Sequence, residues 1–132
     1  MRIADKIEEI EKYLTELSQI KPTSLEQYLE IKNKASCERY FEKIIKAVID
    51  LSKLILKEKN LIIDDERKLF DKLCEAQIIN PQLADRLKDA KGMRNIIAHE
   101  YGRIDDSIVY NSITTEIERD VAEFIKIVKK MY

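Results

Sequence analysis

The chain has 132 residues, of which 45% are hydrophobic, and it contains only two glycines and two prolines. This length and composition are typical of one helical domain, residues 1–132, and argue against a second domain or a turn-rich β fold. Lys and Arg number 24 against 25 Asp and Glu, so the net charge of −1 gives no global attraction to nucleic acid or membranes. Any anionic ligand must therefore be bound by a local basic patch.

No stretch of the sequence reads as a targeting or membrane segment. Charged residues occur throughout residues 1–20, and no later run is apolar for long enough to cross a bilayer. We therefore expect a cytoplasmic protein that does not insert into membranes.

The two cysteines do not suggest a metal site. Cys37 and Cys74 are far apart, with no CxxC pair and a single histidine to join them, so a structural zinc site lacks ligands. We expect both to be core thiols in a reducing compartment, and we expect no bound metal or cofactor.

The first helix is predicted from about Arg2 to Ile20, because apolar residues recur there at alternating spacings of four and three. Lys21-Pro22 ends it, since the residue before a proline disfavours helical geometry. Ser24 with Gln27 then indicates a capping box for a short helix over about residues 25–30.

A second long helix follows and fades near Asn60. Its apolar stripe consists of Cys37, Phe41, Ile44, Val48, Leu51 and Ile55, widened by Ile45 and Leu54. Asp64 or Asp65 is then a candidate N-cap for a shorter helix. That helix is predicted to turn four residues inward, namely Leu69, Phe70, Leu73 and Cys74.

Asn80 and Pro81 predict the start of the next helix, as its N-cap and first helical residue. This helix carries Leu83, Leu87 and Ala90 toward the core and runs into the sequence GMRNIIAHEYGR. The chain restarts as a helix at Asp105 or Asp106, with a bend near Ser112. The stripe of this last helix consists of Ile113, Ile117, Val121, Phe124 and Val128. Together these amphipathic helices and short connections predict an all-α antiparallel bundle.

The stretch GMRNIIAHEYGR holds the only histidine, His99, with Arg94 five residues before it and Tyr101 two after. Imidazole can act as a general base or acid near neutral pH, the guanidinium fork suits phosphate oxygens, and the phenol can orient a phosphate. These groups suit phosphoryl chemistry on RNA, in which the 2′-hydroxyl attacks the adjacent phosphate without a metal ion.

Helical geometry constrains this stretch. In a continuous helix Arg94 and Tyr101 share a face, whereas His99 points about 140° away from Arg94. His99 turns back toward Arg94 only if the helix frays or tightens after Ile97, with Gly102 taking the turn. The spacing therefore predicts a helix end within this stretch.

A single histidine poses a problem for RNA cleavage, which needs one group to accept a proton and another to donate one. A two-fold dimer with both copies facing one cleft supplies two histidines. It also doubles the local positive charge around that cleft. The residues that carry this charge are Lys88, Lys91, Arg94 and Arg103.

Each residue also has a simpler interpretation. His99 alone is a favourable C-terminal cap for the helix dipole, Arg94 alone a surface ion-pair partner, and Tyr101 alone a core or interface ring. A Cys–His nucleophile pair is disfavoured because both cysteines lie on apolar stripes.

The sequence RNIIAHEY resembles the Rx4HxY motif of the HEPN superfamily, in the branch called HepT, the toxin of HepT–MntA toxin–antitoxin modules. The similarity covers nearly the whole chain: Glu38 to Leu56, Leu69 to Asp105 and the closing VAEFIKIV follow the family pattern.

The resemblance implies a bundle of five to six helices, a homodimer with its motifs at a shared cleft, and a metal-independent endoribonuclease. Arg94 and His99 would be the catalytic pair, with Asn95 and Tyr101 in support. Arg39, in CERYF, also follows the family pattern, and for it we favour a buried ion pair over a catalytic role.

The resemblance also implies a partner, an MntA-like minimal nucleotidyltransferase antitoxin that transfers AMP from ATP to the motif tyrosine. Tyr101 would then be the AMPylation site, and the added bulk and negative charge would exclude RNA.

The first hypothesis is thus the toxin of a type VII toxin–antitoxin system. Its alternative is a non-catalytic module that binds the nucleotidyltransferase and presents substrate or nucleotide, and a third reading is a structural bundle whose motif only holds the dimer together.

Overall fold

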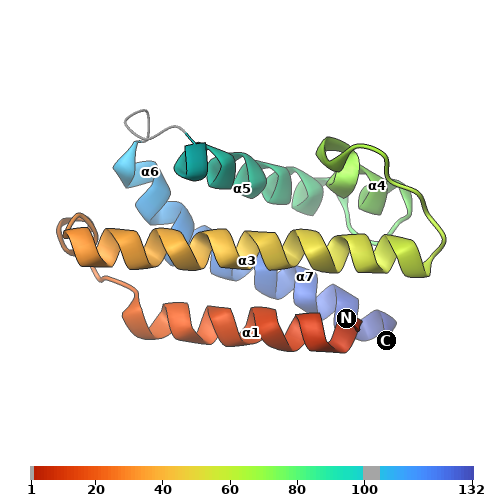
Figure 1. Cartoon of the computed structure of the whole chain (residues 1–132), viewed down its shortest axis with the longest axis horizontal. Coiled ribbons are helices and arrows are strands. Elements are labelled where there is room, and N and C mark those ends of the chain that lie inside the picture. Colours follow the sequence, from red (N-terminus) through yellow and green to blue (C-terminus); the bar gives the residue numbers. More distant parts are fainter. Residues whose placement is uncertain (1, 100–104) are drawn as a thin grey trace.

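Long antiparallel helices form the body of the computed structural model, which describes residues 2–99 and 105–132 (Figure 1). That part of the chain is helical and has no strand. The α-helices are α1 (Ile3–Ile20), α2 (Leu25–Tyr28), α3 (Ile31–Glu58), α4 (Leu69–Glu75), α5 (Pro81–His99), α6 (Asp106–Asn111) and α7 (Ile117–Met131). A 3-10 turn, η1 (Glu66–Lys68), precedes α4, and a π-helical turn, η2 (Ser112–Glu116), joins α6 to α7. The predicted all-α antiparallel bundle is confirmed.

The start of the chain folds largely as its pattern predicts. α1 ends at Ile20, before Lys21-Pro22, and its stripe faces the core. The hydroxyl of Ser24 accepts a hydrogen bond from the Gln27 backbone N–H at 3.1 Å, as the capping box requires. The reciprocal bond differs from the prediction, because the Gln27 side chain accepts from the backbone N–H of Thr23, at 3.0 Å, rather than from that of Ser24.

The long helix α3 lies at the centre of the bundle and packs against α1, α2, α4 and α5 (Figure 1). It ends at Glu58, close to the predicted end, and Asn60 takes a left-handed backbone with φ of 58°. Arg39 corrects the sequence-based expectation: its side chain is exposed and makes no ion pair within residues 2–99 and 105–132, so the buried ion pair is wrong.

The segment before α4 shows why that helix is short. The Asp65 carboxylate accepts from the backbone N–H of Arg67 at 2.9 Å, so it caps the 3-10 turn, and the α-helix begins only at Leu69. Cys37 is buried and Cys74 only half-buried, and both are free thiols. The expectation of a core thiol is therefore confirmed for Cys37 and only partly for Cys74, which packs against the core from a half-buried position.

The helices after α4 begin at the predicted caps. Asn80 Oδ1 accepts from the backbone N–H of Leu83 at 2.7 Å, and Pro81 is the first residue of α5. The Asp105 carboxylate accepts from the backbone N–H of Ser107 at 3.0 Å and caps α6. The predicted bend near Ser112 is the π-helical turn η2. Beyond it the whole predicted stripe is buried, namely Ile113, Ile117, Val121, Phe124 and Val128.

The described part of the chain lacks both a membrane-spanning helix and a cluster of metal ligands. None of its helices is both long enough and apolar enough to cross a bilayer. Nor does it bring together three or more His, Cys, Asp or Glu side chains in a group that could hold a metal ion.

Candidate functional site

The last turns of α5 carry three of the predicted site residues, Arg94, Asn95 and His99. The helix stays α-helical through Ala98 and His99, so it neither frays nor tightens directly after Ile97. The rest of the stretch in which a helix end is predicted, residues 100–103, lies outside the described residues. Buried Ile97 anchors this turn to the core. Regular geometry therefore sets the directions of Arg94 and His99 about 140° apart. Tyr101 and Arg103, also predicted for this site, lie outside the described residues.

The three side chains differ in exposure. Asn95 and His99 are exposed, whereas Arg94 is partly buried. The Nε atom of Arg94 is buried and has no hydrogen-bond partner among the described residues. Within the same residues Arg94 makes no ion pair. Guanidinium donors that no described residue occupies can bind an external anion, such as a phosphate.

The basic patch predicted around Arg94 is weaker than its sequence suggests. Lys88 Nζ lies 2.8 Å from a carboxylate oxygen of Asp71 and 3.6 Å from Asp85, and the hydrogen bond to Asp71 raises the pKa of Lys88. Lys91 Nζ donates to the backbone carbonyl of Glu66 at 3.5 Å. The charge of Lys88 is thus already compensated within the chain, and it adds little attraction for an RNA phosphate.

A shallow groove lies beside the motif helix, between α5 and the α6–η2–α7 helix. Its volume is about 210 Å³, and Met93, Ile108 and Ile117 supply apolar walls. Ile96 on α5 is 41% exposed and Ile108 on α6 is 56% exposed. Charged residues also line the groove, namely Arg86, Asp89, Glu116 and Asp120.

A partly buried polar cluster lies at the end of the bundle where α5 ends. There α2, the start of α3 and α6 meet (Figure 1). Lys34 Nζ on α3 is 2.9 Å from the Asp106 carboxylate on α6. The Tyr28 hydroxyl and one oxygen of Glu38 are buried without a hydrogen-bond partner among the described residues. Burial, aided by the charge of Asp106, raises the pKa of Glu38 although Lys34 lowers it. Periodicity does not reveal this cluster, because its members come from three helices.

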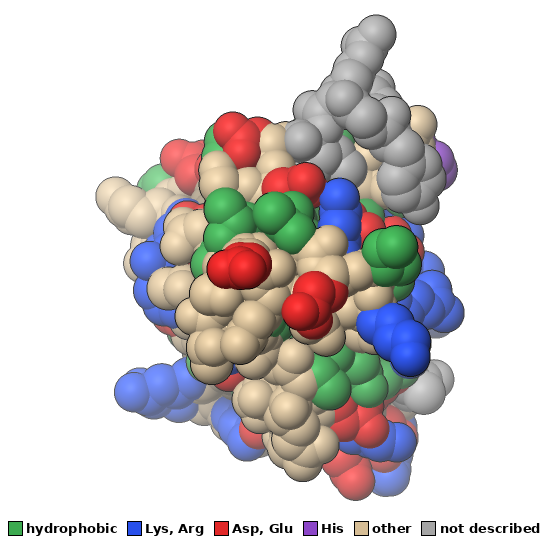
Figure 2. Space-filling view, turned by 90° about the vertical axis from the view of Figure 1, so that its left-hand side faces the viewer, with side chains coloured by type: hydrophobic (Ala, Val, Ile, Leu, Met, Phe, Trp, Pro, Cys, Tyr) green, Lys and Arg blue, Asp and Glu red, His purple; other side chains and the backbone are tan. Residues whose placement is uncertain are grey.

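The outer surface at this end mixes hydrophobic, acidic and basic side chains (Figure 2). Two exposed hydrophobic residues belong to the helices at this end: Leu29 follows α2, and Ile31 begins α3.

Solved structures share this fold. One, a toxin–antitoxin crystal structure with AMP-PNP, has a TM-score of 0.88 and 24% identity, with 97% of each chain covered. Another, a tri-AMPylated Shewanella oneidensis HEPN toxin in complex with MNT antitoxin, has a TM-score of 0.89 and 24% identity. That match covers 98% of this chain and 99% of that one. At this identity the likeness establishes the helical fold.

Curated relatives add sequence similarity. A tRNA nuclease HepT from Aphanizomenon flos-aquae is 31% identical over 119 residues, which are 89% of this chain and 81% of that protein. An mRNA nuclease HepT from Shewanella oneidensis is 30% identical over 89 residues, 67% of this chain and 66% of that protein. The profile of the ribonuclease HepT-like family matches residues 3–129. The chain therefore belongs to the ribonuclease HepT-like family.

Proposed function

We propose that the chain is the toxin of a HepT–MntA (type VII) toxin–antitoxin system and acts as a metal-independent endoribonuclease. The observation that carries this proposal is Arg94, whose buried Nε has no hydrogen-bond partner among the described residues, on the helix that exposes the only histidine, in a member of a ribonuclease family. The two relatives named as RNA nucleases support it. We also propose that residues 1–132 form one domain, which agrees with the single core cluster.

In this proposal Arg94 and His99 are the catalytic residues and Asn95 supports them. The imidazole accepts the proton of an RNA 2′-hydroxyl, which attacks the adjacent phosphorus. The guanidinium stabilises the negative charge that develops on the phosphate oxygens. A second imidazole donates a proton to the departing 5′-oxygen. The products are a 2′,3′-cyclic phosphate and a 5′-hydroxyl end.

The second imidazole would come from a second copy of the chain. Each chain has one histidine, and the regular end of α5 turns it away from Arg94 of the same chain. The exposed apolar side chains of Ile96 and Ile108 support a protein contact next to the motif. A two-fold dimer about this surface would bring two His99 and two Arg94 to one cleft.

Regulation would act on Tyr101. We infer that an MntA-like nucleotidyltransferase transfers AMP to its hydroxyl, two residues after His99 in sequence. Each AMP adds a negative phosphate where the RNA phosphate must bind, so repulsion and occlusion would both stop cleavage. The tri-AMPylated state of the Shewanella toxin supports this inference.

Growth arrest tests the proposed function in cells. Expression without the partner should stop growth, and Arg94→Ala or His99→Ala should relieve the arrest at equal protein abundance. Ile62→Ala, which changes an 84% exposed side chain in the loop after α3, should remain toxic and serves as the control. Full toxicity of the His99→Ala variant would contradict the proposal.

A further inference from the structure

Cationic residues recur along the outer face of α3. Positions 32, 36, 39, 43, 46, 50, 53 and 57 alternate in spacings of four and three, so they fall within an arc of about 100° on the helix. Six of these positions are cationic, and we name them the α3 basic stripe: Lys32, Arg39, Lys43, Lys46, Lys53 and Lys57. The core residues Phe41, Val48 and Ile55 occupy the opposite face.

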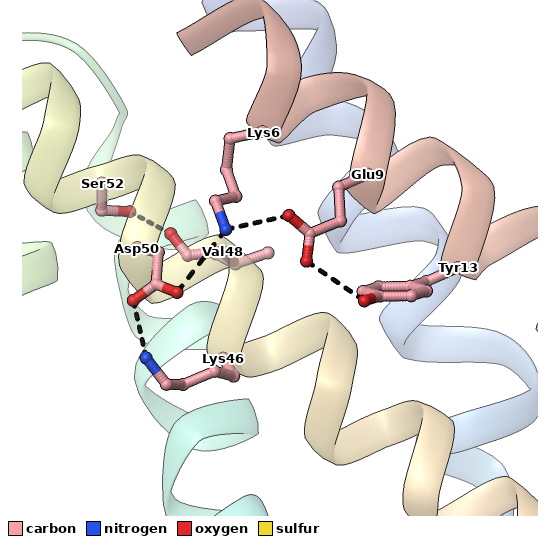
Figure 3. A network of polar contacts seen from close by, with 7 residues as sticks. All are labelled: Lys6, Glu9, Tyr13, Lys46, Val48, Asp50 and Ser52. Carbon is pink, nitrogen blue, oxygen red and sulfur yellow. Dashed lines mark hydrogen bonds and ion pairs between the residues drawn. The ribbon is translucent and has the colours of Figure 1, made fainter. Parts of the chain in front are cut away.

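The stripe has an excess of positive charge, although Glu42 and Glu58 of α3 flank it, about 20° and 40° outside the arc. Asp50, the only acid on the arc, accepts from Lys46 Nζ at 2.8 Å and lies 3.7 Å from Lys6 Nζ (Figure 3). Its single charge is therefore shared between two lysines. Lys53 Nζ lies 3.6 Å from a carboxylate oxygen of Glu66.

Four cations of the stripe have no such partner among the described residues, namely Lys32, Arg39, Lys43 and Lys57. All of them except Lys43 are exposed. When exposed cations without internal partners contact a nucleic acid, they displace the counterions condensed on its phosphates. This release is the main source of sequence-independent affinity for nucleic acid.

Two tyrosine rings adjoin the stripe on the side of α1. Tyr13 and Tyr40 meet edge to face, with ring centroids 6.5 Å apart, and Lys43 Nζ lies 5.3 Å from both centroids. Tyr13 also donates a hydrogen bond to Glu9 at 3.1 Å (Figure 3). Both rings are half-buried and pack against the hydrophobic core, so they hold Lys43 in place at the edge of the stripe, and the cations would supply its phosphate contacts.

The stripe begins at the end of the bundle that carries the candidate site. The first turns of α3 lie at the same end as the last turn of α5 (Figure 1), and the Lys34–Asp106 ion pair joins α3 to α6 there. From Lys32 to Lys57 the stripe extends about 37 Å along the helix axis. RNA bound along it would extend away from the cleavage centre over most of the molecule.

We propose that the α3 basic stripe binds the phosphate backbone of RNA outside the cleavage centre, independently of base sequence. This inference rests on the proposed function, because it assigns a binding surface to the same substrate. RNA fits better than an acidic protein surface, since the cations recur at a regular spacing over about 37 Å, as the phosphates of a nucleic-acid backbone do. The stripe would also supply the local positive charge that the net charge of −1 does not.

The test compares two triple variants of the full-length chain that lose equal charge. Lys32→Ala/Arg39→Ala/Lys57→Ala removes stripe cations that have no ion pair to lose. Lys12→Ala/Lys126→Ala/Lys130→Ala removes exposed lysines of α1 and α7 as the control. Binding of a fluorescent single-stranded RNA is measured by anisotropy over a range of salt, with KM and kcat for its cleavage and with thermal melting to verify folding.

The stripe variant should raise Kd and KM about tenfold or more, lower the salt slope of binding by about 2, and leave kcat unchanged. The control variant should match the wild type. A folded stripe variant with the RNA affinity and salt slope of the wild type would overturn the inference. So would a stripe variant that binds RNA normally and loses only its binding to the antitoxin. If the wild-type chain binds the RNA without cleaving it and the stripe variant does not bind, the inference stands and the proposed nuclease activity fails.

Discussion

Arg94 and His99 lie on one uninterrupted helix, α5, and five residues of regular helical geometry turn their side chains about 140° apart. The guanidinium and the imidazole of one chain therefore point in different directions. This relationship, together with the single histidine, is why we infer a site built from two chains.

Subunit mixing tests the two-chain site. A dimer that needs both imidazoles is inactive when either copy carries His99→Ala. After equal amounts of wild-type and variant chains have exchanged subunits, about a quarter of the dimers remain wild type, and cleavage per total dimer should fall to about that fraction. Cleavage at about half of the wild-type level would instead indicate two independent histidines.

The sequence predicted the helices well because their ends depend on local chemistry. Asn80 followed by Pro81 defines the start of α5, and Asp105 caps α6. Both signals depend on hydrogen bonds between residues at most three positions apart. The start of α4 depends on one further local detail, the 3-10 turn capped by Asp65, which delays the α-helix until Leu69.

The candidate site was less predictable, because neighbours in space decide it. The sequence identified Arg94 and His99, but it did not show that Asp71 compensates Lys88. The cations of α3 are visible in the sequence, yet an ordinary solvated helix face has the same pattern. Only the structure shows that Arg39 lacks the ion pair expected of it.

Modification at Tyr101 has a direct mass signature. Co-expression with the nucleotidyltransferase should increase the intact mass of the chain by whole AMP units, and Tyr101→Phe should remove the increase. Tyr132→Phe, at an exposed tyrosine near the far end of the bundle, is the matched control and should keep it (Figure 1). An AMP-sized increase that persists in Tyr101→Phe would place the modification elsewhere.

The pKa of Glu38 predicts a pH-dependent contribution to stability. Burial raises this pKa, so the folded chain binds the proton more tightly than the unfolded chain does. The contribution of Glu38 to the free energy of unfolding is fully present below the pKa that Glu38 has in the unfolded chain. It is lost as pH rises through the pKa that Glu38 has in the folded chain. Glu38→Gln should therefore be more stable than the wild type at about pH 7 and equal to it near about pH 4, where an unperturbed Glu is largely protonated.

Urea unfolding at the two pH values measures this difference. Glu8→Gln, at an exposed position on α1, is the matched control and should change the free energy of unfolding little at either pH. A Glu38→Gln variant that is less stable than the wild type at neutral pH would mean that the Glu38 charge stabilises the fold, contrary to the expectation from its burial.

Cleavage of RNA by the purified chain in EDTA tests the central claim most directly. The wild-type chain should cut RNA without a metal ion and leave 2′,3′-cyclic phosphate and 5′-hydroxyl ends. His99→Ala should lower the rate by about a hundredfold or more, the usual contribution of a general acid or base. Equal cleavage by the wild type and a folded His99→Ala variant, or cleavage that stops when EDTA is added, would contradict the account.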